Sequence, residues 1–198
     1  MEGLIGNMKF ILASKSPRRK EILKKIIPEF ETIVSNYDEH LTPGMPKAKQ
    51  VIELSYQKAK DIFDKTEGDR VVIGSDTIVV KDDVIYGKPK SKENAKELIK
   101  QLLSGDRAHN VITGICVLVQ KDEKIERYDE FDSARVYFTD ITDEEIDTWI
   151  ATGKAMDKAG AYAIQDEFGV FVEKIEGNYS AVVGLSMPKV YSIIKKYM

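Results

Sequence analysis

The chain has 198 residues, of which 42% are hydrophobic and 32% charged, and its formal net charge at pH 7 is −3. This composition is typical of a folded globular protein and excludes a disordered chain. The small negative charge argues against a broad nucleic-acid-binding surface, and no apolar stretch approaches the roughly 20 residues that a membrane span requires. The single cysteine, Cys116, excludes a disulfide framework within the chain.

The N-terminus does not resemble a secretory signal, because Asn7 and Lys9 interrupt its apolar residues. We therefore expect a cytoplasmic protein. We expect residues 1–198 to form a single domain, in which residues 1–7 are a disordered extension.

The N-terminal half is predicted to begin with a strand at residues 9–13 that leads directly into a helix over about 17–27. Ser16 suits the N-cap of this helix and Pro17 its first position. A strand at 30–35, a polar loop at 36–46 and a helix over about 47–65 follow. We expect the next strand, 70–80, to be interrupted at 74–76, since glycine in a strand often marks a bulge or a close backbone approach.

The C-terminal half continues with a short strand at 84–86 and a helix that Ser91 caps and that ends near Leu103. Two long strands are predicted at 111–120 and 125–138, joined by a charged turn. Thr142 caps a helix over about 143–151. The remaining predicted elements are a glycine-punctuated loop at 153–160, a strand at 168–175 and a helix at 187–197. Strand–helix units combined with an antiparallel pair predict an α/β fold with a mixed sheet.

The start of the first predicted helix suggests a phosphate site. A helix N-terminus exposes unpaired N–H groups and a positive dipole end, which favour an anion. Arg18 and Arg19 lie in that first turn, where a carboxylate would be more stable, and a bound polyphosphate would explain both arginines. The alternative is a solvated arginine pair on a surface helix, and this stretch alone leaves both open.

Asp76 is the second notable residue, because it lies within an otherwise apolar strand. Burying a carboxylate is costly unless it is paired. Asp76 either accepts hydrogen bonds from turn amides or serves as a general base or a Mg²⁺ ligand.

Six short motifs follow one another along the chain. They are Ser-Lys-Ser-Pro-Arg-Arg at 14–19, Gly-Ser-Asp-Thr at 74–77, Gly-Lys-Pro at 87–89, Leu-Ser-Gly at 103–105, Thr-Gly at 113–114 and Asp-Lys-Ala-Gly-Ala-Tyr-Ala-Ile-Gln at 157–165. Together they resemble the Maf family of nucleoside triphosphate pyrophosphatases, from Lys9 to the final helix. The resemblance implies an elongated, twisted mixed sheet flanked by helices, with two lobes around a cleft, similar to inosine triphosphatases.

The resemblance also implies an enzyme that hydrolyses a nucleoside triphosphate to the monophosphate and pyrophosphate with a divalent metal, Mg²⁺ or Mn²⁺. The 157–165 segment is similar to the branch that acts on dTTP and UTP. Asp76 matches the catalytic base of the family, and Glu39 is its expected partner in a metal site. The positions that match phosphate ligands are Ser14, Arg18, Arg19, Lys58 and Lys88. Without the resemblance, Lys58 and Lys88 would be interpreted as solvated lysines.

Base choice is expected to depend on Arg18, Thr77 and Gln165, which match specificity positions of the family. A glutamine amide offers one donor and one acceptor to the imide edge of uracil or thymine, but a flipped amide would match cytosine equally well. Asp157 and Lys158 either hold this segment or contact phosphate. The alternative for 157–165 as a whole is a packing loop rich in glycine and alanine.

The chain departs from the family pattern without losing a proposed catalytic group. Lys154 and Ala155 stand where Glu-Pro is common, and Asp166 and Glu167 follow Gln165 where glycine is usual. The acidic pair therefore bears on base preference rather than on the type of reaction.

Two other functions are compatible with these residues. One is a pyrophosphatase with another base preference, such as 7-methyl-GTP or a modified pyrimidine nucleotide. The other is a non-catalytic nucleotide-binding regulator of cell division, since the family is linked to septum formation. Asp76 favours an enzyme, because a carboxylate that faces a triphosphate weakens binding unless a metal intervenes. A homodimer is a family-level expectation, and neither nucleic acid nor a membrane is an expected partner.

Overall fold

The computed structural model describes residues 8–198, so the extension expected at residues 1–7 lies outside the described part of the chain. The described residues divide into two compact units. The first unit contains the chain up to Asp76 together with residues 113–132 and 184–198, and the second contains 77–112 and 133–183. Across residues 8–198, no helix combines the length and apolar character needed to cross a membrane.

The described strands form a mixed seven-stranded sheet in the order β2-β1-β3-β5-β6-β7, with β4 paired to β3. β1 runs parallel to both of its neighbours, whereas β4 and β7 are antiparallel to theirs. The predicted α/β class with a mixed sheet is therefore confirmed. The strands are β1 (Lys9–Leu12), β2 (Glu31–Thr32), β3 (Arg70–Lys81), β4 (Val84–Tyr86), β5 (Ala108–Lys121), β6 (Lys124–Phe138) and β7 (Val172–Glu176).

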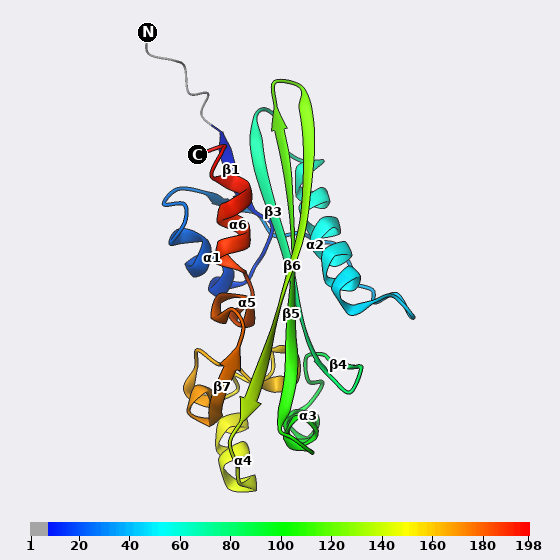
Figure 1. The fold of residues 1–198 in the computed structure, drawn as a ribbon, viewed down its shortest axis with the longest axis vertical. Coiled ribbons are helices and arrows are strands. Elements are labelled where there is room, and N and C mark those ends of the chain that lie inside the picture. Colours follow the sequence, from blue (N-terminus) through cyan, green and yellow to red (C-terminus); the bar gives the residue numbers. More distant parts are fainter. Residues whose placement is uncertain (1–7) are drawn as a thin grey trace. The chain divides into compact units, whose positions relative to one another are not determined.

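In the first unit, helices α2 (Lys47–Phe63) and α6 (Met187–Ile194) lie on opposite sides of β6 (Figure 1). Lys189 of α6 pairs with Glu130 at 2.9 Å, whereas the Arg127 guanidinium lies 3.6 Å from the centre of the Tyr56 ring of α2. Successive side chains of a strand point to opposite faces. The even-numbered Glu130 therefore contacts α6 on one face of β6, and the odd-numbered Arg127 contacts α2 on the other. Helix α1 (Pro17–Lys24) follows β1 in the same unit.

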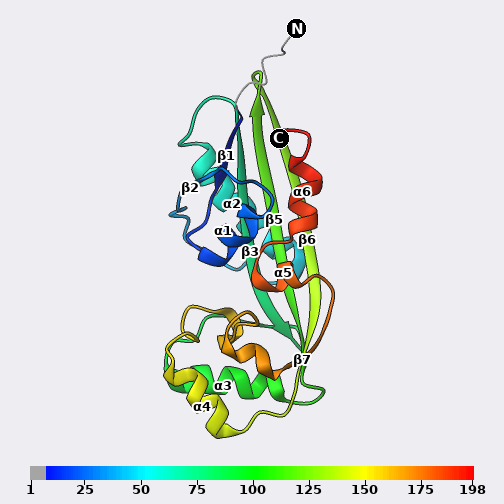
Figure 2. The same ribbon diagram turned by 90° about the vertical axis from the view of Figure 1, so that its left-hand side faces the viewer.

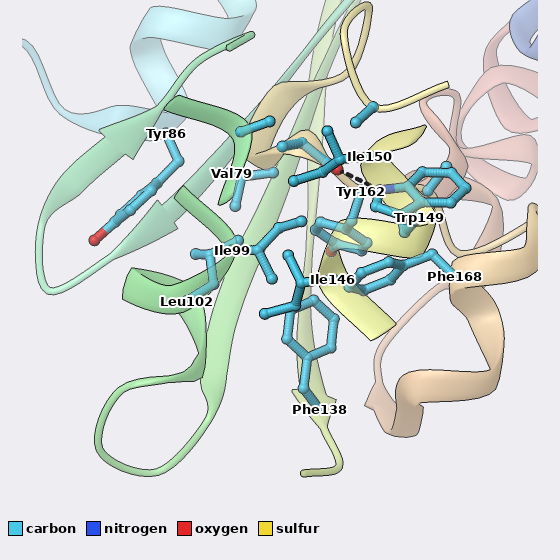
Figure 3. Close-up of a cluster of buried hydrophobic side chains, with 14 of the residues drawn as sticks. Val79, Tyr86, Ile99, Leu102, Phe138, Ile146, Trp149, Ile150, Tyr162 and Phe168 are labelled. Atoms are coloured by element: carbon cyan, nitrogen blue, oxygen red, sulfur yellow. Dashed lines mark hydrogen bonds between the residues drawn. The ribbon is translucent and has the colours of Figure 1, made fainter. Parts of the chain in front are cut away.

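The second unit is organised around an aromatic core that includes Phe138, Trp149, Tyr162 and Phe168 (Figure 3). Helices α3 (Lys92–Leu103) and α4 (Asp143–Ala151) pack against each other in this unit (Figure 2). The Trp149 indole donates a hydrogen bond to the carbonyl of Ala161 at 2.8 Å. This bond fixes the chain that follows α4, where short helical turns occur at 159–161 and 167–171.

The predicted helix starts are confirmed, but several ends are wrong. Ser16, Ser91 and Thr142 cap α1, α3 and α4 as predicted, each by accepting a bond from a backbone N–H. Helices α1, α2 and α6 end two or three residues earlier than predicted, and β2 keeps only two residues, both of them exposed. The N-terminus of a helix is marked in the sequence by its capping side chain. The C-terminal ends of these helices depend on tertiary packing, which the sequence pattern does not show.

The predicted strand at 168–175 is also partly wrong, because residues 167–171 form a helical turn and β7 begins only at Val172. The N–H of Gly169 donates to the carbonyl of Asp166 at 2.9 Å, which closes the turn and buries Phe168. A short helix, α5 (Tyr179–Val183), is not predicted by the sequence pattern.

Strand β3 is continuous, so the interruption predicted at Gly74–Asp76 is wrong, but the close backbone approach is confirmed. A Cβ atom on Gly74 would lie 2.1 Å from the carbonyl oxygen of Ser55 in α2. A Cβ atom on Gly114, in neighbouring β5, would lie 2.3 Å from the carbonyl of Val51. Only hydrogen fits at these two positions, and α2 therefore lies directly on both strands.

We predict that Gly74→Ala lowers the free energy of unfolding by roughly 1–3 kcal/mol, because the new methyl group meets backbone that cannot rotate away. Urea unfolding measures this loss. Gly87→Ala is the control, since a Cβ there meets nothing within 4 Å. Equal unfolding free energies for the two variants would contradict the direct seating of α2 on the sheet.

The second unit also buries an ionisable side chain. His109 in β5 lies beside Phe138, and its Nε2 is 2.7 Å from the hydroxyl of Tyr162. Its Nδ1 has no hydrogen-bond partner within residues 8–198. Burial, assisted by the positive charge of Lys81 and opposed by Asp106, lowers the pKa of His109 to about 3. His109 is therefore neutral in the folded protein at neutral pH.

We predict that His109 makes the protein less stable in mild acid. The unfolded chain binds a proton at the ordinary histidine pKa of about 6.5, whereas the folded chain binds it only near pH 3. The stability that the neutral histidine confers is complete above about pH 6.5 and is lost as the pH falls towards 3, by up to a few kcal/mol. His109→Gln should flatten this dependence in urea unfolding measured at several pH values. The same pH dependence in His109→Gln and in the wild type would contradict the assignment.

Candidate active site

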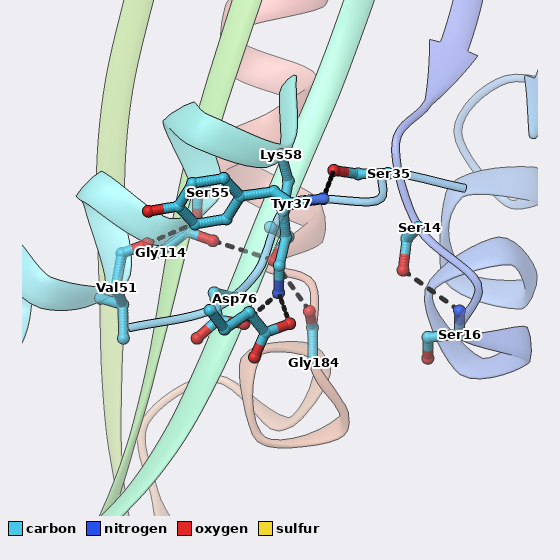
Figure 4. Close-up of polar contacts among 12 residues, drawn as sticks. Ser14, Ser16, Ser35, Tyr37, Val51, Ser55, Lys58, Asp76, Gly114 and Gly184 are labelled. Carbon is cyan, nitrogen blue, oxygen red and sulfur yellow. Dashed lines mark hydrogen bonds and ion pairs between the residues drawn. The ribbon is translucent and has the colours of Figure 1, made fainter. Parts of the chain in front are cut away.

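In the first unit, the ammonium of Lys58 lies between two carboxylates. Its Nζ is 2.5 Å from Asp76 Oδ1 and 2.7 Å from Glu39 Oε1. Figure 4 shows Lys58 of α2 directed at Asp76 of β3. The side chains of Lys58 and Asp76 are only 10% and 9% exposed. A buried carboxylate and a buried ammonium are each costly alone, so this pairing is the reason that an acid is tolerated in an apolar strand.

Helix α2 also fixes the loop that carries Glu39. At one end of the loop, the N–H of Asn36 donates to the Asp61 carboxylate at 2.9 Å. At the other end, Gln50 accepts a bond from the N–H of Thr42 at 3.0 Å and donates to its carbonyl at 2.6 Å. A loop without secondary structure is thus anchored twice on one helix, with Glu39 between the anchors.

Sequence reasoning missed Gln50 and Asp61 as anchors of this loop. A signal was present, because Gln50, Lys58 and Asp61 recur at spacings of eight and three residues, which place them on one side of a helix. Only the structure shows that Gln50 is 4% exposed, a burial that is rare for a glutamine without a structural partner.

Ser14 and Arg19 lie together at the start of α1. The Ser14 hydroxyl accepts a hydrogen bond from the N–H of Ser16 at 3.1 Å and lies 3.5 Å from Arg19 Nη1. Burial lowers the pKa of the Arg19 guanidinium, while the two carboxylates that pair with Lys58 raise it. Arg19 is therefore within electrostatic reach of both acids. Arg18, in the same turn, opposes them through its own positive charge.

The orientation of Arg19 depends on a backbone carbonyl far away in the sequence. Arg19 Nε donates to the carbonyl of Gly184 at 2.8 Å. The buried hydroxyl of Ser75 lies 3.0 Å from the same oxygen and 2.8 Å from the carbonyl of Gly114. Gly184 thus joins α1 to β3 beside Asp76. Sequence reasoning missed Ser75 and Gly184, since no local pattern pairs residues 109 positions apart.

In the second unit, Lys158 is buried and its ammonium faces three acceptors. Nζ lies 2.5 Å from the carbonyl of Lys154, 2.7 Å from Asp157 Oδ1 and 3.5 Å from Asp166 Oδ2. An ammonium has three N–H bonds, and each has an acceptor here. The sequence left two roles open for Lys158, holding the 157–165 segment or contacting phosphate. This geometry favours the first role. Gln165 lies exposed within the segment that Lys158 closes.

In the same unit, residues that differ from the family pattern form ion pairs. Lys154 Nζ lies 2.5 Å from Glu167 Oε1, and Asp166 is the third acceptor of Lys158. Each ion pair joins a residue that precedes Gln165 in the sequence to a residue that follows it. The acidic pair at 166–167 therefore has partners within the loop itself.

Lys88 is exposed in the loop after β4, where the carbonyl of neighbouring Gly87 accepts a bond from the N–H of Gly160 at 3.0 Å. Thr77 is half-buried in β3. The predicted site residues thus form two groups. The first unit contains Ser14, Arg18, Arg19, Glu39, Lys58 and Asp76, and the second contains Thr77, Lys88, Asp157, Lys158 and Gln165.

Carboxylates are the side chains here that could ligate a metal. Within residues 8–198, no three His, Cys, Asp or Glu side chains converge to form a complete metal site. Glu39 and Asp76 do converge, on the single ammonium of Lys58. Mg²⁺ sites in nucleotide enzymes commonly use one or two carboxylates and complete the coordination with substrate phosphates and water. Glu39 and Asp76 match in number and type the protein carboxylates of such a site.

Comparisons with a family model and with known proteins assign the chain to the same family. Residues 9–197 match the family described as Maf-like protein. The dTTP/UTP pyrophosphatase of Alkaliphilus metalliredigens (strain QYMF) is 48% identical over 191 residues, 96% of each chain. The dTTP/UTP pyrophosphatase of Thermoanaerobacter sp. (strain X514) is 43% identical over 189 residues, again 96% of each chain. Among solved structures, the Staphylococcus aureus Ham1 protein matches with a TM-score of 0.42 and 16% identity, over 82% of this chain and 90% of that one. By its sequence match over nearly the whole length, the chain belongs to the Maf-like protein family.

Proposed function

We propose that this protein hydrolyses dTTP and UTP to the nucleoside monophosphate and pyrophosphate. The observation that carries the proposal is the buried Asp76 carboxylate, paired with Lys58 in the same unit as the arginines at the start of α1. The names of the relatives that are 48% and 43% identical over nearly the full length support the choice of substrates. We place the activity in the cytoplasm, the compartment of nucleotide metabolism.

In this proposal, Asp76 is the general base. It accepts a proton from a water molecule whose oxygen bonds to the α-phosphorus, while the bond from that phosphorus to the bridging oxygen breaks and pyrophosphate leaves. Arg18 and Arg19 bind the phosphates beside the positive dipole end of α1, since arginine can donate two parallel bonds to phosphate oxygens. The Gly184 carbonyl keeps Arg19 oriented throughout.

We further propose that Glu39 and Asp76 bind Mg²⁺ or Mn²⁺ together with the phosphates. A cation bound there would supply the charge neutralisation that a triphosphate needs beside two acids. Arg18, Arg19 and Lys58 carry three positive charges against the two negative charges of Glu39 and Asp76, which leaves little surplus for a nucleotide with several negative charges.

In the second unit, Lys88 is proposed to contribute a further phosphate contact, and Thr77 and Gln165 to read the base. The pyrimidine edge with its N3–H and carbonyl matches the donor and acceptor of the Gln165 amide. Asp157 and Lys158 hold the segment that presents this amide.

The primary test is pyrophosphate release from a panel of nucleoside triphosphates with Mg²⁺, Mn²⁺ or a chelator. We expect release from dTTP and UTP, with the monophosphate as co-product, only when a divalent cation is present. Asp76→Asn should reduce turnover by roughly 10²-fold or more and retain nucleotide binding, because it removes the base and keeps the shape. Asp147→Asn is the control, since Asp147 forms an exposed ion pair with Lys96 at 2.7 Å.

Two outcomes of this panel would contradict the proposal. Orthophosphate and the diphosphate as products would mean that a different bond is broken. Nucleotide binding by the wild-type protein without any turnover would instead support the non-catalytic regulator.

We predict that Gln165→Ala changes the order of preference among the nucleoside triphosphates of the panel more than it changes the maximal rate on a poor substrate. The alanine removes the proposed base contact but leaves the groups around the phosphates intact. Values of kcat/KM for each nucleotide measure the effect, and Gln101→Ala, at an exposed position of α3, is the control. An unchanged order of preference would assign base recognition to other groups.

A further inference from the structure

Lys58 contacts an oxygen of each of the two carboxylates proposed to bind the divalent cation. We infer that Lys58 and the divalent cation compete for Glu39 and Asp76, and that Lys58 leaves the two acids when the nucleotide brings the metal. The inference rests on the proposed function, because it concerns the same two acids. It assigns to Lys58 a role before substrate binds, in addition to any phosphate contact.

The argument begins with space and charge. Mg²⁺ binds carboxylate oxygens at about 2.0–2.1 Å, whereas the ammonium lies 2.5 Å from Asp76 Oδ1 and 2.7 Å from Glu39 Oε1. A cation shared by these same oxygens would lie against the ammonium. Both charges are positive, and Lys58 and Asp76 are only 10% and 9% exposed, so their repulsion at Asp76 is poorly screened, whereas the side chain of Glu39 is 49% exposed and its charge is better screened. The two cannot occupy the pair of carboxylates together.

The contacts of the neighbouring cations indicate that Lys58 is the one that moves. Within residues 8–198, the polar contacts of the Lys58 ammonium are the two carboxylates alone. Arg19 is held differently, because its Nε donates to the backbone carbonyl of Gly184, an acceptor that cannot rotate away as a side chain can. A lysine has a flexible four-carbon stem, and a nearby triphosphate would offer its ammonium new anionic partners.

This exchange would couple metal binding to nucleotide binding. Without nucleotide, the ammonium keeps the buried Asp76 paired, so the two acids bind a free divalent cation weakly. With nucleotide, the phosphates pair with Lys58 and add oxygen ligands for the metal, so the cation binds well only when the substrate is present.

The test measures Mn²⁺ binding by the protein without nucleotide, from the loss of the free-ion signal in electron paramagnetic resonance. We expect Lys58→Met to bind Mn²⁺ at least about tenfold more tightly than the wild type, since one nearby positive charge is removed. Lys60→Met is the matched control. It removes the same charge from the same helix, at an exposed pair with Asp64 at 2.5 Å, and should leave Mn²⁺ affinity unchanged.

Two further variants keep the test decisive. Lys58→Gln is also uncharged but can donate hydrogen bonds to the acids, and it replaces Lys58→Met if that variant does not fold. Adding Asp76→Asn to either variant should abolish the gain in affinity, which assigns the gain to this carboxylate. Thermal unfolding without metal shows that each variant is folded.

The inference is overturned if Lys58→Met and Lys58→Gln bind Mn²⁺ no more tightly than the wild type and Lys60→Met. This failure is distinct from failure of the proposed function, which the wild-type product panel decides. If the wild type releases pyrophosphate as expected but the Lys58 variants bind Mn²⁺ no more tightly than the wild type, the exchange is rejected and the enzyme assignment stands.

Discussion

A buried acid in an apolar strand needs a cation at contact distance, and the pairing of Asp76 with Lys58 meets this need only because helix α2 lies directly on the sheet. Gly74 and Gly114 permit that approach, since a side chain at either position would overlap the backbone of α2. The same helix then carries the anchors of the loop that supplies Glu39. Gly74 and Gly114 thus allow the contact between the helix and the sheet that brings Lys58 to the two carboxylates.

The environment of Arg19 shows why this cluster is arranged in advance of any ligand. A guanidinium that loses contact with water needs acceptors, and the Gly184 carbonyl provides one that cannot rotate away. Ser75 shares this carbonyl and lies next to Asp76 in β3. Arg19 and Lys58 have different partners, a backbone carbonyl for the arginine and a pair of side chains for the lysine. This difference is the basis of the proposal that Lys58, and not Arg19, changes partners when a nucleotide binds.

The second unit meets a different requirement, the fixing of a segment rich in small residues. Glycine and alanine contribute little packing of their own, so the chain from 157 to 165 depends on neighbours at its flanks. The Trp149 indole holds the carbonyl of Ala161, His109 holds the hydroxyl of Tyr162, and Lys158 joins Asp157 to Asp166. These contacts restrict the backbone on both sides of Gln165, whose exposed amide is the group proposed to read the base.

The sequence by itself determined the mixed α/β class, the capped starts of three helices, the family and the list of candidate residues, because apolar periodicity, capping side chains and short motifs are local signals. It did not determine that β3 is continuous through Asp76 or that residues 167–171 turn helically. Nor did it identify Gln50, Ser75 and Gly184 as supports of the site. These features depend on contacts between residues distant in the chain, and only tertiary structure decides them. Asp76 is the clearest case, since its residue type and position were evident from the sequence, but its partner became evident only when α2 came to lie on the strand that carries it.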